Sequence, residues 1–111
     1  ILNRLFYAGG KYLSYKPAAA VVTARRAGTT AALDVLNKYF TVNNMPVVSS
    51  QYWNMVHGRT PEEVSRDVEG LQTMAVLGQN MAWLLKSLAL SDKNNQPHPQ
   101  LSAKQKTNFI R

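Results

Sequence analysis

Two short stretches hold most of the side chains that could bind a ligand. The first, residues 23–30, reads Thr-Ala-Arg-Arg-Ala-Gly-Thr-Thr and joins two guanidinium groups to a glycine and several hydroxyls. Guanidinium groups and the N–H groups at the start of a helix both attract an anion or the polar edge of a cofactor. Solvated surface charges explain Arg25 and Arg26 equally well. Both interpretations stay open at this point.

The second stretch, residues 49–58, crowds aromatic rings into a few positions. Tyr52, Trp53 and His57 fall within six residues, and Gln51 and Asn54 add amide groups. Aromatic side chains on a loop suit stacking against a planar ring or packing in an interface. Filling of the core is the alternative, above all for Trp53.

Several other chemistries are disfavoured. The chain has no cysteine, which excludes a disulfide, a thiol nucleophile and a thiolate metal site. Its two histidines, His57 and His98, have no second ligand at metal spacing, so we expect no metal site. Asp34 falls on a solvated helix face, and Glu62 and Glu63 are explained by helix capping. No carboxylate pair or Ser-His-Asp arrangement stands out.

The elements that must position these stretches follow a strand, helix, strand order. Residues 18–24 are nearly all apolar without alternation, which is typical of a strand buried on both faces of a parallel sheet. A core-facing helix is predicted from Gly28 onward, with Leu33, Leu36 and Phe40 on one face, and Asn43-Asn44 ends it. Residues 45–50 supply a second short apolar strand. The two candidate loops thus follow the two strands, at the edge where ligands bind in such sheets.

A long helical region completes the pattern. Thr60-Pro61-Glu62-Glu63 has the form of a capping box with proline in the first turn, and apolar residues then keep helical spacing from Val64 to Leu88. We expect one helix, or two broken near Gly70. Its length of about 40 Å exceeds a small domain, so part of it is expected to pack on another subunit. Leu2, Leu5 and Phe6 indicate the last turns of a further helix.

In a sheet of only two strands, both strands are edge strands. An exposed apolar edge strand is prone to aggregate unless another segment covers it. We therefore expect the chain to be the C-terminal half of an open, doubly wound α/β domain, completed by missing sequence or by another chain. Residues 1–90 form that part of the domain, and residues 91–111 are a polar tail that is mobile or docked. Phe109-Ile110 could anchor the tail on a neighbour, and a frayed end is the alternative.

Composition adds limits on partners and location. The 111 residues carry 13 Lys and Arg against 6 Asp and Glu, a net charge of +7, but these charges are scattered and form no stripe for nucleic acid. No apolar run approaches the length of a membrane span. The chain begins with Ile1 and no signal peptide follows, so we expect truncation at the N-terminal side and cytoplasmic residence.

The two stretches and the long helix resemble the C-terminal half of the flavodoxin-like NAD(P)H-dependent FMN reductases, a family of multimeric flavoproteins. The matching residues are 19–32, 44–58, 67–74, 77–86 and 107–111, and the run Tyr-Trp-Asn-Met-Val-His-Gly at 52–58 is specific. The resemblance implies a flavodoxin-like doubly wound parallel sheet, of which this chain supplies the βαβα portion. It also implies a homo-oligomer, a dimer or a tetramer.

What the resemblance implies chemically is an oxidoreductase with noncovalent FMN, reduced by NADH or NADPH and reoxidised by free flavin, quinone or another acceptor. The cofactor carries the hydride, so no side chain is assigned as a catalytic base. The first stretch would border the isoalloxazine ring, and the second would lie close to the flavin of its own or a neighbouring subunit. The implied cofactor-binding residues are Thr23, Ala24, Arg25, Arg26, Ala27, Gly28, Thr29, Thr30, Tyr52, Trp53, Asn54 and His57.

One departure from the family pattern bears on this implication. The family's flavin-phosphate loop and a second flavin-contacting loop follow earlier strands, and this sequence contains neither. The FMN phosphate is therefore not assigned to Arg25 and Arg26, which we reserve for the ring edge, the NADPH phosphate or a subunit contact. The alternative function is a noncatalytic oligomerisation or remnant module of the same fold that binds no flavin.

Overall fold

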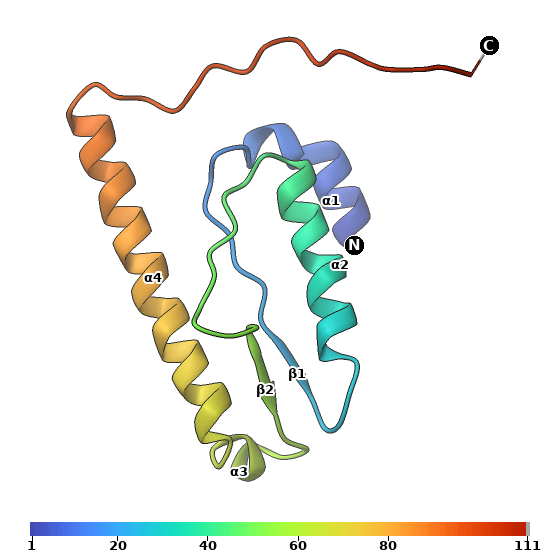
Figure 1. Cartoon of the computed structure of the whole chain (residues 1–111), viewed down its shortest axis with the longest axis vertical. Coiled ribbons are helices and arrows are strands. Elements are labelled where there is room, and N and C mark those ends of the chain that lie inside the picture. The colour runs from blue at the N-terminus through green and yellow to red at the C-terminus, as the bar shows by residue number, and fades with distance from the viewer. Residues whose placement is uncertain (111) are drawn as a thin grey trace.

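A computed structural model of the chain describes residues 1–110 (Figure 1). It is a partial α/β fold with two parallel strands and helices on both sides of them. In chain order the elements are α1 (Leu2–Gly9), the short 3-10 helix η1 (Gly10–Tyr12), β1 (Val22–Ala24), α2 (Thr29–Val42), β2 (Met55–His57), α3 (Pro61–Val64) and α4 (Val68–Lys93).

The two strands form a parallel ladder, with Val22 opposite Met55 and Ala24 opposite His57. Figure 1 shows α4 on one side of this pair and α2 on the other. In agreement with that view, α2 contacts β1 and α4 contacts β2. The apolar core is small because only two strands lie between the helices; its buried members are Ala20, Leu33, Val48, Met55, Val56 and Leu77.

The predicted strand positions were wrong in part. The regular strand β1 covers only the end of residues 18–24, and residues 45–50 contribute a single bridge, Val47 to Ala18. The second strand instead falls at 55–57, inside the predicted loop. Between the Ala18–Val47 bridge and the Val22–Met55 pair, the chain advances four residues on the β1 side but eight on the β2 side. Residues 49–54 therefore bulge out of the ladder. Pairing to β1, rather than local apolarity, therefore decides where the second strand lies.

The helix predicted after Gly28 is confirmed. It begins at Thr29, directly after Gly28 in the left-handed region at φ 91°, where a residue without Cβ has the least strain. It ends at Val42, and Asn43 caps it as the Asn-Asn pair predicts. Thr29 and Leu33 are its buried residues, so α2 packs on β1 with its first two turns.

The capping box at residues 60–63 is confirmed, and of the two alternatives for the helical region the structure has two helices, with the break at residues 65–67 and not at Gly70 itself. Thr60 Oγ1 accepts from Glu63 N at 3.3 Å, and α3 ends after one turn. The chain then restarts as α4 because Asp67 Oδ1 accepts the N–H of Gly70 at 2.9 Å. Gly70 thus lies in the first turn of α4 instead of between two helices.

The helix expected near the N-terminus is present as α1, held by an aromatic contact. Phe6 stacks on Tyr39 of α2 with ring centroids 5.3 Å apart and meets Phe40 edge-on at 6.0 Å. None of the α1 residues is buried. At the other end, α4 includes residues 91–93 of the predicted tail, and residues 94–110 form neither helix nor strand; His98 stacks on Tyr15, whereas Phe109 and Ile110 are exposed.

No helix among residues 1–110 combines the length and the apolar character needed to cross a bilayer.

Candidate functional site

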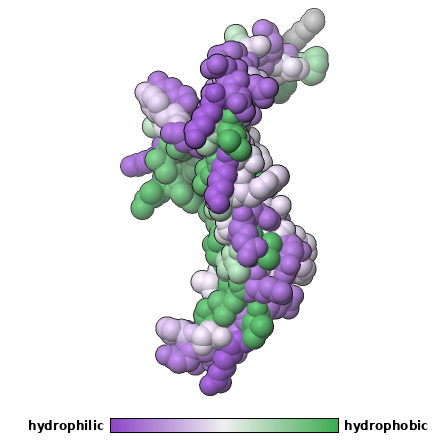
Figure 2. Space-filling view, turned by 90° about the vertical axis from the view of Figure 1, so that its left-hand side faces the viewer, coloured by the Kyte–Doolittle hydropathy of each residue, from purple (hydrophilic) through white to green (hydrophobic). Residues whose placement is uncertain are grey.

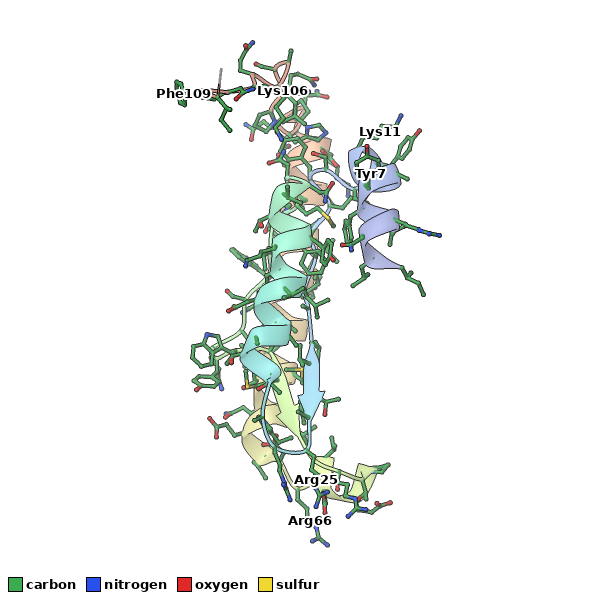
Figure 3. All side chains as sticks on the ribbon, turned by 90° about the vertical axis from the view of Figure 1, so that its right-hand side faces the viewer. Tyr7, Lys11, Arg25, Arg66, Lys106 and Phe109 are labelled. Carbon is green, nitrogen blue, oxygen red and sulfur yellow. The ribbon has the colours of Figure 1, made fainter. Side chains whose placement is uncertain are left out.

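The two strands end side by side, which brings residues 25–28 of the first predicted loop next to Gly58, the last residue of the second; the rest of the second loop precedes β2 or forms it. Gly58 N donates to Ala24 O at 3.1 Å, so the chain leaves β1 and β2 at neighbouring positions. These ends lie at the lower part of Figure 1. Residues 25–28 are all exposed. Figure 3 shows Arg25 and Arg66 together at this end of the molecule. Among residues 1–110, no ion pair involves Arg25 or Arg26.

Asp67 fastens the end of β2 to the start of α4. Its Oδ2 accepts the backbone N–H of His57 at 2.6 Å, while Oδ1 caps α4 through Gly70. The His57 Nδ1 lies 3.9 Å from the same carboxylate, with the imidazole 43% and the carboxyl 20% exposed. The His57 N–H first, and the Gly70 N–H second, lower the pKa of Asp67 below its usual value. Asp67 therefore stays ionised and holds His57 in place.

Sequence reasoning missed Asp67. The signal for it is an aspartate directly before a helical apolar pattern, the ordinary N-cap position. The capping box at Thr60 begins the short helix α3, and the separate start of α4 at Val68 was not assigned to Asp67. That signal accounts for the cap on Gly70 N, whereas the bond from His57 N to Asp67 is a tertiary contact that the sequence does not indicate.

A hollow of about 230 Å³ opens beside this anchor. It brings together two predicted site residues, Tyr52 and His57, with polar groups that were not predicted. Its full lining is Tyr52, Met55, His57, Asp67, Glu69, Gly70 and Thr73. An aromatic ring, an imidazole and the N-terminal turn of a helix can together contact a planar polar ligand.

Trp53 turns toward α2, away from this hollow. It lines a second hollow of about 290 Å³ with Thr30, Leu33 and Asp34. The indole is 56% exposed, so the alternative that Trp53 fills the core was wrong. The rings of Tyr52 and Trp53 still touch, with centroids 5.1 Å apart. Thr30 of the first predicted loop and Trp53 of the second therefore line one hollow, which lies beside α2 and not beside α4.

Asn54 is buried, unlike the surrounding loop. Its backbone oxygen accepts from Val22 N at 3.0 Å, which starts the β1 and β2 ladder. The predicted residues thus separate into distinct environments. Thr23 and Ala24 belong to β1, Arg25 to Gly28 are exposed beyond it, and Thr29 is buried at the start of α2. His57 lines the hollow beside α4, Thr30, Trp53 and Asn54 line the hollows beside α2, and Tyr52 borders both sides.

Within residues 1–110, no three His, Asp or Glu side chains come close enough together to hold a metal ion.

Comparisons with family models, with curated proteins and with solved structures each give no match.

Proposed function

We propose that this chain forms part of an FMN-binding oxidoreductase of flavodoxin-like fold, which passes hydride from NADH or NADPH through FMN to a flavin, quinone or other acceptor. The observation that carries the proposal is that the first candidate loop leaves β1 beside the carboxyl end of β2, where His57 ends the strand and Gly58 N donates to Ala24 O. Ligands of open α/β sheets bind at that edge. The resemblance of both loops to the FMN reductases supplies the identity of the cofactor.

The residues at this edge suit the polar rim of a flavin ring. The exposed segment from Arg25 to Gly28 offers main-chain groups and two guanidinium groups, and it leads into the N-terminus of α2. Both features favour negative charge, and FMN gains negative charge on its pyrimidine edge when it is reduced. Tyr52 and His57 would contact the ring from the neighbouring hollow.

The flavodoxin-like part of the proposal requires the sheet to continue past β1. Val22 N–H and Ala24 O both bond toward the β2 segment, so the N–H and C=O of Thr23 point to the opposite edge. Figure 3 shows α1 on that same side, and α1 has no buried residue. Additional strands, from further sequence or from another chain, would pair with β1 and cover α1.

A homo-oligomer is part of the same proposal. On α4, the row of positions Gly70, Thr73 and Leu77 is buried. A second row, which starts one residue later, has heptad spacing and consists of leucine, methionine and one glycine. That second row is Leu71, Met74, Gly78, Met81 and Leu85, with Leu71 and Leu85 exposed. Figure 2, which faces the α4 side, shows green apolar surface between purple polar residues. A neighbouring subunit would bury this row.

The same exposed row favours the alternative function, a noncatalytic assembly module of this fold. Trp83 and Leu90 add further exposed apolar surface to α4, far along the helix from the strand ends. In that case the loops would have no ligand, and association alone would be the function.

Titration of FMN into the purified chain, followed by quenching of flavin fluorescence and by the visible difference spectrum, separates the two. We expect saturable binding that Tyr52→Ala and His57→Ala each weaken by about tenfold, the loss of roughly one good contact. Gln79→Ala, an exposed amide on α4, is the control and leaves binding unchanged. A folded chain that forms a discrete oligomer by light scattering and shows no saturable FMN binding would reject the oxidoreductase and support the assembly module.

A second measurement addresses the reaction. With FMN bound, anaerobic addition of NADH or NADPH is expected to bleach the flavin absorbance, and the faster of the two identifies the donor. Bound flavin that neither nucleotide bleaches would contradict the proposed hydride transfer.

A further inference from the structure

A small cavity of about 90 Å³ lies between α2 and residues 47–54, and its lining includes Asn37 and Asn54, whose amide oxygens are both buried. Asn54 is only 6% exposed, and its Oδ1 is buried without a hydrogen-bond partner. Asn37, on α2, lines the same cavity and has an Oδ1 in the same condition. They are the two side-chain oxygens of this kind among residues 1–110.

Two unpaired acceptors at one cavity indicate a missing donor. An amide oxygen removed from water without a partner is unfavourable, and most buried polar groups in native proteins are hydrogen-bonded. Asn37 and Asn54 come from different elements, α2 and the segment before β2, so their presence at one cavity does not follow from one local turn. A ligand that donates N–H groups would satisfy both oxygens.

The adjoining hollow supplies an aromatic face and a negative charge. It shares Leu33 and Trp53 with the cavity and adds Asp34. The indole of Trp53 is largely exposed, and among residues 1–110 no basic group lies within ion-pair distance of Asp34. The two hollows together are therefore lined by two asparagines with unpaired buried oxygens, one free carboxylate and one aromatic ring, and a ligand would reach the oxygens by a small movement of the asparagine side chains.

We infer that these two adjoining hollows form a binding site for a guanidinium group, delivered by a small guanidino compound or by an arginine side chain of another protein. Guanidinium is planar, carries five N–H donors and a permanent charge, stacks on indole and pairs with carboxylate. A neutral amide lacks the charge that matches Asp34. An alkylammonium lacks the flat face that matches Trp53.

This inference does not rest on the flavin proposal. The flavin contact His57 lies in the hollow beside α4, whereas Asn37 and Asp34 belong to α2; Tyr52 lines both that hollow and the small cavity and is therefore left out of the tests of the guanidinium site. The guanidinium site would stand even if the chain bound no FMN, and the flavin proposal would stand without the guanidinium site.

The experiment uses the Trp83→Phe variant, so that fluorescence reports on Trp53 alone. N-methylguanidinium chloride is titrated against tetramethylammonium chloride at matched ionic strength, because the second cation has the same charge and no N–H donor. Side-chain amide resonances of Asn37 and Asn54 are followed in the same samples by NMR. We expect a saturable change with methylguanidinium in both signals and only a non-saturating drift with tetramethylammonium.

Three substitutions test the residues. Asp34→Asn and Asn37→Leu should each weaken methylguanidinium binding by about tenfold, roughly one charge-assisted hydrogen bond. Gln79→Leu makes the same kind of change on the exposed face of α4 and should leave binding unchanged. Circular dichroism confirms that each variant folds. Because Asp34 is exposed, Asp34→Asn keeps the test valid even if Asn37→Leu does not fold.

The outcomes are distinct. Tighter binding of a Gly-Arg-Gly peptide than of methylguanidinium would assign the group to a protein arginine, and equal or weaker binding would assign it to a small compound. Equal responses to both cations, no saturation in folded protein, or binding that survives Asp34→Asn and Asn37→Leu would each overturn the inference.

Discussion

Replacement of Gly70 by alanine is the sharpest test of the anchor between β2 and α4. A Cβ at position 70 would lie 2.4 Å from Asp67 Oδ2, 2.9 Å from its Cγ and 3.1 Å from the backbone oxygen of Met55. The carboxylate would have to move, and its hydrogen bonds to His57 N and Gly70 N would weaken or break. Glycine is therefore required here by close approach and not by an unusual backbone angle.

The expected magnitude follows from two opposed effects. Hydrogen bonds to a charged group are worth about 1.5–3 kcal/mol each, although the partial exposure of Asp67 reduces that value. Alanine inside a helix is favoured over glycine by about 1 kcal/mol. We expect Gly70→Ala to lower the free energy of unfolding by about 1–3 kcal/mol.

Gly78 provides the matched control in the same helix. A Cβ there would meet nothing within 4 Å, so Gly78→Ala should show the helix propensity alone and raise the free energy of unfolding by up to about 1 kcal/mol. Urea denaturation followed by circular dichroism measures both variants. The cost of Gly70→Ala should also shrink in an Asp67→Ala background. If Gly70→Ala proved as stabilising as Gly78→Ala, the proposed close contact with Asp67 would be refuted.

Three further predictions follow from contacts around this anchor. Folding lowers the pKa of Asp67, so the ionised carboxylate stabilises the fold fully above its unfolded pKa of about 3.9, and this stabilisation is lost as the pH falls through the folded pKa. The free energies of unfolding of the wild type and of Asp67→Asn, measured between pH 5 and pH 3, should therefore approach each other at the acid end. Ser50 Oγ donates to Thr73 O at 2.7 Å, so Ser50→Ala should cost about 1 kcal/mol and speed amide exchange in residues 49–54, whereas unchanged exchange would contradict this tether. Phe6→Ala should cost about 1–2 kcal/mol and expose the α1 amides to exchange, while Tyr7→Ala, at an exposed position of the same helix, should not.

Local patterns predicted the elements whose ends are set by their own residues. The helix from Thr29 to Val42 follows from Gly28, its apolar spacing and Asn43, and the turn at α3 follows from Thr60 and Pro61. The second strand was misplaced because residues 45–50 are more apolar than residues 55–57, yet β1 pairs mainly with the latter. Strand register depends on distant partners, which a single sequence does not reveal.

In the candidate site too, features set by local residues were predicted, and features set by distant contacts were not. The composition of residues 52–57 drew attention to Tyr52 and His57, and the structure brings them into one hollow. Asp67 joins them through a backbone hydrogen bond, for which its residue type gives only a capping signal. The burial of Asn54 was not predicted, because an asparagine beside exposed aromatic residues ordinarily lies at the surface.

Residues 49–54 lie between the two ligand sites that we propose. Ser50 and Asn80 tie this segment to α4, through Thr73 O and Ser49 O, while Trp53 and Asn54 face α2. His57→Ala should therefore weaken FMN binding without changing methylguanidinium binding, and Asp34→Asn should do the reverse. Parallel titrations of both ligands into both variants measure this separation. Loss of both ligands in either folded variant would mean that residues 49–54 respond as one unit, and the two sites would then have to be treated as one.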